Sequence, residues 1–467
     1  MRLILKFLLV PCCFIFICIT SSFSQDIVIN NIVLAGHKIT ADPVIYRELD
    51  IQPGDTLQLT SLSDDLSRNK KRLLSTGLFN IVDVNIKNWD TESNLLDVHF
   101  QLKENWYIYP SIIWEYADRS FNVWWKDFRF NFKRTNYGLR VDHLNLTGHK
   151  DRLKLKFQRG FTQKYEALYT YPYFIGNWGL GGSLFFSENK EMGYKTEQNR
   201  PLFLRTEDER ILLTRLRAGL SLYNRTNAYA FHTFRIQLHN NNIDEVVYKE
   251  LNPDYFLNGA SGIKFMYGEY DFQYDRRVFP TYPEGGYLLF FNLKKEGFGI
   301  FNEYDNLSVF GGFEKHIPIS KNLIFGNRVK LKYNLIRDQV GYANNTGLGY
   351  GDYVRGYELY VVDGTDFFLS KTDLKWRIFQ KIFDIKEYMF ISQFDELPIS
   401  IWLRGSFDIG YVNEPTYKET NFLANNWMWG GGPGMDIMIY NNYKISFEYN
   451  FNRLGEGGLF LGGGFSF

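Results

Sequence analysis

Cysteine is scarce in this chain of 467 residues and is confined to one N-terminal segment. The three cysteines are Cys12, Cys13 and Cys18. They lie within residues 1–24, which have the pattern of a cleaved secretory signal peptide. A mature chain without this segment has no cysteine, which excludes disulfides, a thiol nucleophile and a cysteine metal site.

The signal pattern consists of a basic start, an apolar run over residues 7–19, and small residues ahead of a predicted cleavage before Gln25. The basic and small residues are Arg2, Lys6, Ser22 and Ser24. The apolar run is short for a membrane-spanning helix, so we favour export over the alternative, an uncleaved anchor helix.

Long apolar runs and an excess of one charge are also missing. After residue 24, no stretch approaches the ~20 apolar residues that a transmembrane helix needs. The chain has 53 basic and 52 acidic residues, of which the signal segment holds only two, both basic. A nearly neutral chain has no overall attraction to nucleic acid, so we predict no nucleic-acid partner.

Enzyme motifs are absent as well. The seven histidines are scattered, without an H-E-x-x-H motif and without a pair four residues apart. The glycine clusters at 347–351 and 430–434 lack the Lys-Ser/Thr pair of a phosphate-binding loop. We therefore predict that the protein is not an enzyme and has no catalytic residue, metal or cofactor.

Aromatic residues, in contrast, are plentiful. The chain has 32 Tyr, 42 Phe and 10 Trp, or 18% of its residues. This content, with a mildly polar mean hydropathy of −0.29, is typical of a transmembrane β-barrel, whose aromatic side chains gather at the two membrane interfaces. Composition alone leaves a soluble all-β protein open as the alternative.

Residues 25–104 predict a small α+β unit with the order β-α-α-β-β. A strand at 27–34 precedes two helices, the second of which begins at Ser61 with Asp64 as the partner in a capping box. Apolar residues then alternate with polar residues in two strands near 82–86 and 96–102. Such alternation indicates a sheet with one face packed under the helices.

From residue 105 to 467 helical periodicity gives way to short alternating segments. At 328–335 and 444–451, charged or polar residues alternate with apolar ones. A barrel accommodates both sets, because apolar side chains face lipid and charged side chains face a wet lumen. The length of this region fits about sixteen antiparallel strands.

The last strand, near 458–467, is rich in glycine and ends in alternating aromatics. Its residues of interest are Gly462, Gly463, Gly464, Phe465 and Phe467. Because glycine weakens strand pairing, we predict a weak seam between this strand and the first one, near 106–114. The glycines could equally make room for lumen side chains, and the sequence leaves both interpretations open.

Several segments resemble known families. LAGHKIT at 34–40 and RLLSTGLF at 72–79 resemble a polypeptide-transport-associated (POTRA) domain. Three later segments resemble the BamA/TamA-like superfamily of outer-membrane assembly and translocation proteins. The residues that match the family's central barrel motif are Asp275, Arg276, Phe279, Pro280 and Gly286. Those that match the signature of its sixth extracellular loop are Val354, Arg355, Gly356 and Tyr357. Those that match the partner motif on a nearby strand are Phe407, Asp408 and Gly410. A terminal Phe on an alternating strand is similar to the assembly signal of bacterial outer-membrane barrels.

The superfamily resemblance implies that the connection between strands ending near Leu335 and beginning near Phe367 enters the lumen, with Arg355 set against Asp408. A guanidinium and a carboxylate in a partly dry lumen would form charge-assisted hydrogen bonds. The alternative is that Arg355 is a solvated turn residue.

The resemblance also implies a location in the outer membrane of a Gram-negative bacterium, with the POTRA domain in the periplasm. We predict an assembly factor that captures unfolded outer-membrane or exported polypeptides by strand addition and inserts them through the barrel seam. Outer-membrane lipid and periplasmic chaperones or accessory lipoproteins are the other expected partners. The alternative function is a polypeptide secretion pore of the two-partner type.

Overall fold

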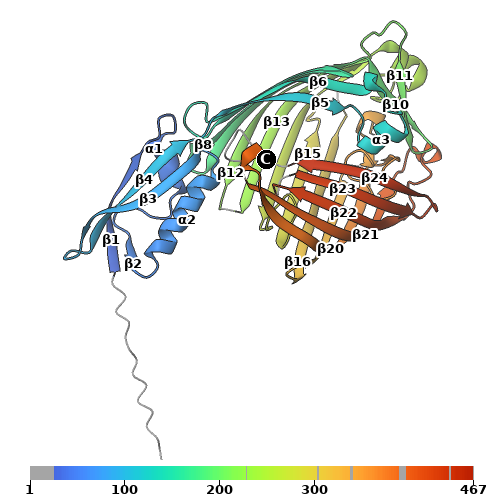
Figure 1. Cartoon of the computed structure of the whole chain (residues 1–467). Coiled ribbons are helices and arrows are strands. Elements are labelled where there is room, and N and C mark those ends of the chain that lie inside the picture. Colours follow the sequence, from blue (N-terminus) through green and yellow to red (C-terminus); the bar gives the residue numbers. More distant parts are fainter. Residues whose placement is uncertain are drawn as a thin grey trace, which may run out of the picture. The chain divides into compact units, whose positions relative to one another are not determined.

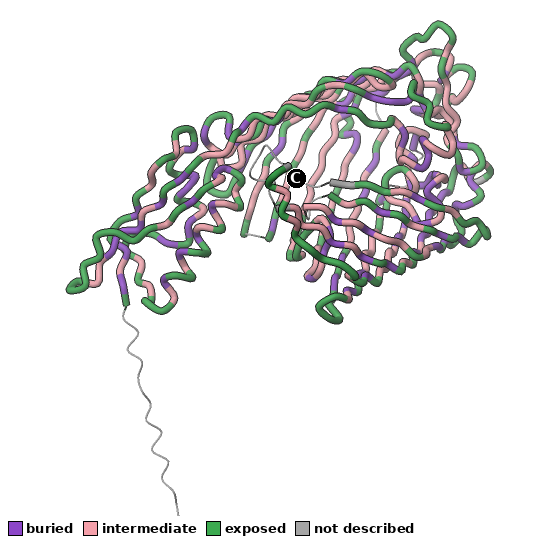
Figure 2. Tube along the Cα trace, in the orientation of Figure 1, coloured by how far each residue is buried: buried purple, intermediate pink, exposed green. Residues whose placement is uncertain are grey.

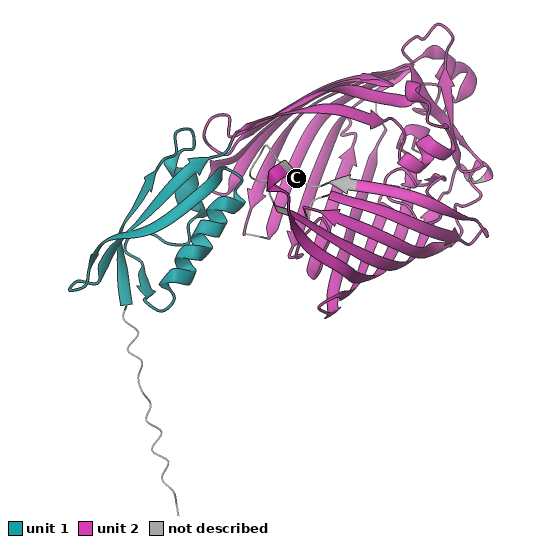
Figure 3. Ribbon diagram, in the orientation of Figure 1, with its two compact units in different colours: residues 1–105 teal, residues 106–467 magenta. Residues whose placement is uncertain are grey.

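The computed structural model describes residues 26–227, 229–301, 304–336, 340–388, 396–440 and 443–465. These residues form two compact units that divide between Asn105 and Trp106 (Figure 3). The predicted signal peptide, residues 1–24, and Phe467 lie outside the described residues.

The first unit is a four-stranded sheet with two helices. Its elements are β1 (Asp26–Ala35), α1 (Asp42–Glu48), β2 (Thr56–Gln58), α2 (Leu62–Ser75), β3 (Phe79–Asp90) and β4 (Leu95–Glu104). The strand order is β2-β1-β4-β3, so β3 lies at an edge. The core contains four fully buried side chains: Ile27 of β1, Leu96 and Phe100 of β4, and Leu73 of α2.

Two details of this unit differ from the sequence prediction. The three-residue strand β2 stands between the helices, and it is too short for an alternating pattern to reveal it. The predicted capping box at Ser61 is wrong. Ser61 has helical dihedrals, and its hydroxyl donates to Asp65 Oδ2 at 2.9 Å instead of accepting from the helix backbone.

The second unit is a sixteen-stranded antiparallel sheet that curves around a central interior (Figure 1), and the predicted strand number is confirmed. Its strands are β5 (Ile108–Tyr116), β6 (Thr135–Leu144), β7 (Arg152–Gly160), β8 (Thr162–Ile175), β9 (Trp178–Asn189), β12 (Leu213–Arg225), β13 (Ala230–Ile243), β14 (Gly262–Asp275), β15 (Gly286–Glu296), β16 (Asn306–Ser320), β17 (Leu323–Asn334), β20 (Asp366–Asp384), β21 (Glu396–Asn413), β22 (Met428–Ile439), β23 (Tyr443–Asn452) and β24 (Gly457–Phe465). Each strand pairs with the next in this order, and β5 and β24 are the two edges.

Apolar and charged side chains occupy opposite faces of the strands. On β17, Leu331 and Tyr333 are exposed outward, whereas Lys330 and Lys332 point inward and bind the connection that follows. Lys330 Nζ lies 2.6 Å from a carboxylate oxygen of Asp352 in that connection. Burial changes repeatedly along strands such as β22 and β23 (Figure 2), as the period of two predicts.

Antiparallel pairing places every second connection at the same end of the sheet. The elements in these connections are α3 (Phe121–Lys126), η1 (Phe132–Arg134), the hairpin of β10 (Glu191–Glu197) and β11 (Arg200–Arg205), η2 (Val247–Leu251), η3 (Tyr342–Asn344), β18 (Thr346–Leu348), β19 (Val362–Asp363) and η6 (Lys418–Thr420). The short helix η4 (Lys386–Tyr388) lies in a connection at the opposite end. Within the described part of the chain, every helix is too short or too polar to cross a membrane.

Candidate functional site

Residues 340–365, in the connection between β17 and β20, fold into the interior of the sheet. Val354 and Tyr357 in this connection are 1% and 2% exposed. Both belong to an apolar cluster with Leu369 of β20, Val412 of β21 and Met428 of β22. We call this connection the lumen loop, because its apolar residues pack against the inner face of three neighbouring strands.

Arg355 at the centre of the lumen loop is bound to Asp408 on β21. The guanidinium Nη1 lies 2.7 Å from Asp408 Oδ1, and the backbone N–H of Arg355 donates to Oδ2 at 3.0 Å. The Asp408 side chain is fully buried. The structure thus brings together the two residues that the sequence motifs paired, through both the side chain and the backbone of Arg355.

Two further strands contribute acids to the same guanidinium. Arg355 lies 3.0 Å from Asp373 on β20 and 3.5 Å from Glu448 on β23. Burial would lower the pKa of Arg355, but Asp373 and Asp408 outweigh burial and raise its pKa above the ordinary value. The guanidinium therefore stays charged and ties the loop to three strands.

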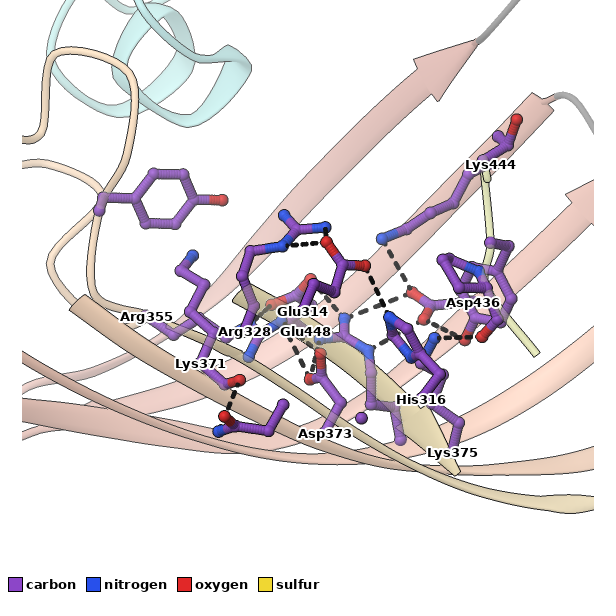
Figure 4. A pocket seen from close by; sticks show the side chains of 17 residues that line it. Glu314, His316, Arg328, Arg355, Lys371, Asp373, Lys375, Asp436, Lys444 and Glu448 are labelled. Carbon is purple, nitrogen blue, oxygen red and sulfur yellow. Dashed lines mark hydrogen bonds and ion pairs between the residues drawn. The ribbon is translucent and has the colours of Figure 1, made fainter. Parts of the chain in front are cut away.

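Arg404 on β21 completes the network of charges. Its guanidinium lies 3.2 Å from Asp373, 2.9 Å from Asp436 on β22 and 2.5 Å from Glu448. Figure 4 labels these three acids beside the cavity. Arg404 and its three acids, Asp373, Asp436 and Glu448, are not among the residues predicted from the sequence motifs. The available signal was the period of two, because Arg404 and Asp408 lie four residues apart and share a face of β21. Pairing between different strands could not be inferred from it.

Glycines on the wall make room for the loop. A Cβ atom on Gly410 would lie 2.5 Å from Val354 Cγ2, and a Cβ atom on Gly430 of β22 would overlap the carbonyl oxygen of Arg355. Gly356 in the loop has a φ of +86°, which favours glycine. Gly356 in the loop and Gly410 on β21 therefore let the lumen loop pack closely against the barrel wall. Phe407, in contrast, points outward and is 50% exposed.

A cavity of about 250 Å³ lies beside this network, and most of its lining is charged. The connection between β14 and β15 closes one side of the cavity with Tyr282, whose hydroxyl donates to Asp436 at 2.8 Å. Lys375 of β20 donates to the carbonyl of Pro283 in the same connection at 3.1 Å. This segment therefore touches the network through residues that the sequence motif did not single out.

Two residues predicted from the central barrel motif, Asp275 and Gly286, stabilise the conformation of that connection. Asp275 binds Arg277, with Oδ2 2.7 Å from Nη2. Gly286 has a φ of +89°, and a Cβ atom there would overlap the carbonyl oxygen of Arg276. Arg276 and Pro280 are exposed and do not line the cavity.

The lumen loop also contains buried acids outside the barrel strands. Burial raises the pKa of Glu358 to about 7, and its Oε1 accepts from Asn450 of β23 at 3.1 Å. Burial likewise raises the pKa of Asp363 to about 6. Protonation of these acids near neutral pH is therefore coupled to the packing of the loop.

The seam between β5 and β24 is a second candidate site. Among the described residues, no backbone pairing joins these two strands. A Cβ atom on Gly462 would lie 3.5 Å from Ser446 Cβ, and one on Gly463 would lie 3.9 Å from the carbonyl oxygen of Lys444. These are ordinary contact distances, so crowding does not require glycine at either position. Gly464 and Phe465 pair with Lys444 and Tyr443 of β23.

The first unit offers a third candidate surface, a groove of about 650 Å³ between α2 and the edge strand β3. Its apolar lining includes Leu62 and Leu66 of the helix and Ile86 and Trp89 of the strand. Ile86 is 37% exposed and Trp89 is 41% exposed. An apolar groove beside an unpaired strand is suited to the addition of an extended peptide.

Within the described ranges, no group of three His, Cys, Asp or Glu side chains is placed to hold a metal ion. The strongest features of the site are therefore the ionic network, the open sheet edges and the groove of the first unit.

Comparisons with known proteins agree with this architecture. Residues 27–105 match the POTRA family, described as a surface antigen variable number repeat. BamA from Haemophilus ducreyi lacking POTRA domains 1-3 is similar in structure, with 14% identity, a TM-score of 0.58, and 94% of this chain and 84% of that chain covered. None of the curated proteins matches the chain.

Two structures of CdiB are also similar. CdiB from Acinetobacter baumannii has 12% identity and a TM-score of 0.51, with 94% of this chain and 73% of that chain covered. CdiB from Escherichia coli has 10% identity and a TM-score of 0.50, with 95% of this chain and 90% of that chain covered. The resemblance inferred from the sequence is confirmed at the level of the fold: the chain has the architecture of a BamA/TamA-like surface antigen barrel with one POTRA domain.

Proposed function

We propose that the protein is an assembly factor in the outer membrane of a Gram-negative bacterium, which captures polypeptide clients and inserts them through the seam between β5 and β24. The observation that carries this proposal is that no backbone pairing joins β5 and β24, the two edges of the sheet, over the residues that the structure describes. An unpaired edge presents backbone N–H and C=O groups in the spacing that an added strand needs.

The POTRA groove is the proposed site of first capture, on the periplasmic side. An extended client would pair with the edge of β3 and place alternate side chains against Leu66 and Ile86. Strand addition is tolerant of sequence, because most of its hydrogen bonds involve the backbone. The groove therefore supports a role in binding many unfolded clients, and periplasmic chaperones or accessory lipoproteins would deliver them.

The lumen loop is the proposed reason why clients leave sideways. Arg355, Asp408 and the apolar cluster around Val354 fix the loop inside the barrel. Release of the loop would separate buried charges from their partners, which is costly. This cost opposes the passage of a client through the interior. A passive porin is disfavoured for the same reason.

A polypeptide secretion pore is the second candidate. The lumen loop is held by ionic contacts and by an apolar cluster, and a conformational change that released both would widen the interior. The fold does not choose between the two functions, because the TM-scores with BamA and with the two CdiB structures are similar.

Depletion of the protein, followed by quantification of the outer-membrane and periplasmic proteomes, tests the proposal. We expect many unrelated barrel proteins to fall together in the outer membrane. Accumulation of a single exported protein in the periplasm, with barrel proteins constant, would favour the secretion pore instead.

Complementation of the depleted cells assigns the defect to individual surfaces. Ile86→Asp should impair rescue, because it places a charge in the POTRA groove. Ile81→Asp is the matched control, because Ile81 lies on the same strand and is exposed but does not line the groove. Equal rescue by both variants would remove the groove from the proposal.

A further inference from the structure

The connection between β5 and β6, residues 117–134, contacts the free edge of β24. Asn122 in α3 is 5% exposed, and its side chain makes two hydrogen bonds to one residue of that strand. Asn122 Nδ2 donates to the carbonyl oxygen of Leu461 at 3.1 Å, and the backbone N–H of Leu461 donates to Asn122 Oδ1 at 3.0 Å. Both backbone groups of Leu461 are therefore bound by a single side chain.

A carboxamide has the same donor and acceptor as a peptide group. Leu461 stands opposite Phe447 of β23, and its N–H and C=O point away from β23 toward the open edge. Asn122 thus occupies the position that a peptide group of an added strand would take. Residues two positions away, Leu459 and Gly463, present their backbone groups on the same side.

Local sequence positions Asn122 for this contact. Ser120 accepts from the backbone N–H of Val123 at 3.2 Å and starts α3, which carries Asn122 in its first turn. One turn later, Lys126 Nζ lies 4.1 Å from the centre of the Phe460 ring. Gly458 of β24 lies beside the same ammonium group, which would be 3.0 Å from a Cβ atom there.

The same connection is hydrogen-bonded to the lumen loop. The Arg119 guanidinium donates to three carbonyl oxygens of the loop, at 3.1 Å to Gly349, 2.6 Å to Tyr360 and 2.5 Å to Leu359. A second set of contacts ties the connection to the hairpin of β10 and β11, where Arg200 lies 3.1 Å from Asp127. Movement of α3 away from β24 is therefore coupled to the lumen loop.

We propose that α3 is a removable cap on the free edge of β24, and that Asn122 must leave Leu461 before an extended polypeptide strand can pair there. The inference rests on the proposed function of the seam. It adds that Asn122 occupies the edge of β24 when no client is bound. The expected occupant is an extended polypeptide strand. Its backbone C=O and N–H groups would bind the N–H and C=O of Leu461 in place of the Asn122 amide.

Photo-crosslinking of the full mature chain, folded in detergent micelles, tests the cap. A photoreactive benzoylphenylalanine in place of Leu459, which is 46% exposed on β24, reports pairing at this edge only. The probe is a fluorescent peptide with the sequence of β5, residues 108–116, because β5 is the strand at the other side of the seam. The same peptide with N-methyl groups on alternate residues cannot pair through its backbone and is the negative control.

We expect Asn122→Ala to raise the yield of peptide adduct about tenfold, because two hydrogen bonds no longer compete with the peptide. Asn426→Ala is the matched control, since the Asn426 amide donates to the carbonyls of Phe422 and Ala424 within its own connection. Adduct yields that are equal in the two variants, or equal for the methylated and unmethylated peptides, would overturn the cap.

A locked cap tests the proposal with a covalent link in place of the Asn122 amide hydrogen bonds. Residues 25–467 have no cysteine, so Asn122→Cys with Leu461→Cys introduces the only thiols, which a short bismaleimide can join. We expect the joined protein to lose adduct formation and the unjoined double variant to retain it. If Asn122→Ala fails to fold, this pair decides alone, and undiminished adducts in the joined protein refute the cap.

These outcomes separate the cap from the function on which it rests. Adducts that rise in Asn122→Ala, with no change of barrel proteins on depletion, would overturn the assembly function and leave the cap in place. Adducts that stay constant, with a general loss of barrel proteins on depletion, would overturn the cap alone.

Discussion

Gly410 on β21 leaves the space that Val354 of the lumen loop fills. A Cβ atom on Gly410 would lie 2.5 Å from Val354 Cγ2 and 3.0 Å from Leu348 Cδ1. Because Arg355 follows Val354 directly, the same fit sets the distance between its guanidinium and Asp408. An apolar contact and an ionic contact therefore depend on one another in this loop.

Gly410→Ala should loosen the lumen loop. The added methyl group must displace Val354, and overpacking of this kind costs roughly 1–3 kcal/mol. The measurement is maleimide labelling of a cysteine introduced at Val361, a loop position that is 0% exposed while the loop is docked. Labelling should accelerate in Gly410→Ala and stay unchanged in Gly405→Ala, a glycine on the same strand with nothing within 4 Å of an added Cβ. Equal acceleration in both would contradict this account of the loop.

Removal of the Arg355 guanidinium should have a larger effect. Arg355→Ala leaves Asp408 buried without its closest cation, and loss of one partner from a buried pair costs about 3–5 kcal/mol. Lys371, 3.6 Å from Asp408, compensates in part. Labelling at Val361→Cys measures the release of the loop. A charge swap, Arg355→Asp with Asp408→Arg, should recover some of the loss, and a swap no better than either single reversal would argue against the pairing.

The lumen loop should be held more tightly at mildly acid pH than at mildly alkaline pH. Burial raises the pKa of Glu358 to about 7, so the docked loop binds this proton better than a released loop does. The resulting stability is complete below the ordinary pKa of a glutamate and is lost as the pH rises through about 7. Glu358→Gln should weaken this dependence and leave the part due to Asp363, whose pKa burial raises to about 6. The test compares the labelling rates of the two proteins at each pH, and a constant ratio between pH values would refute it.

In the POTRA domain, Glu104 should stabilise the turn after β1 at neutral pH. Its carboxylate accepts from the backbone N–H groups of Lys38, Ile39 and Thr40, at 3.1, 3.0 and 2.6 Å. Burial alone would raise the pKa of Glu104, but these hydrogen bonds outweigh it and lower the pKa.

A carboxylate with a lowered folded-state pKa contributes stability above its unfolded pKa, and this is lost as the pH falls through the folded value. Glu104→Gln should therefore accelerate hydrogen exchange at residues 38–40 near neutral pH, and the difference from the unchanged protein should disappear in acid. A difference that persists in acid would show that charge is not the cause.

The sequence alone predicts the alternation of side chains along the strands. Arg328, Lys330 and Lys332 stand between apolar residues on β17, and a period of two assigns each set to a face without knowledge of neighbouring strands. The length of the region, divided by a typical strand and turn, predicts about sixteen strands for the same reason. Within the first unit, the long helix α2 was equally clear, but the three residues of β2 were too few to form a pattern.

The sequence by itself determined the faces of the strands, the strand number and the two short segments around Arg355 and Asp408, because these depend on local periodicity and on motifs that are continuous in the chain. Only the tertiary structure decided which charges meet. Asp373, Arg404 and Glu448 come from three different strands, and their distances depend on the register between those strands. The same holds for Asn122 and Leu461, which are 339 residues apart in the chain. Their contact depends on how the ends of the sheet approach one another, and local chain chemistry does not encode that approach.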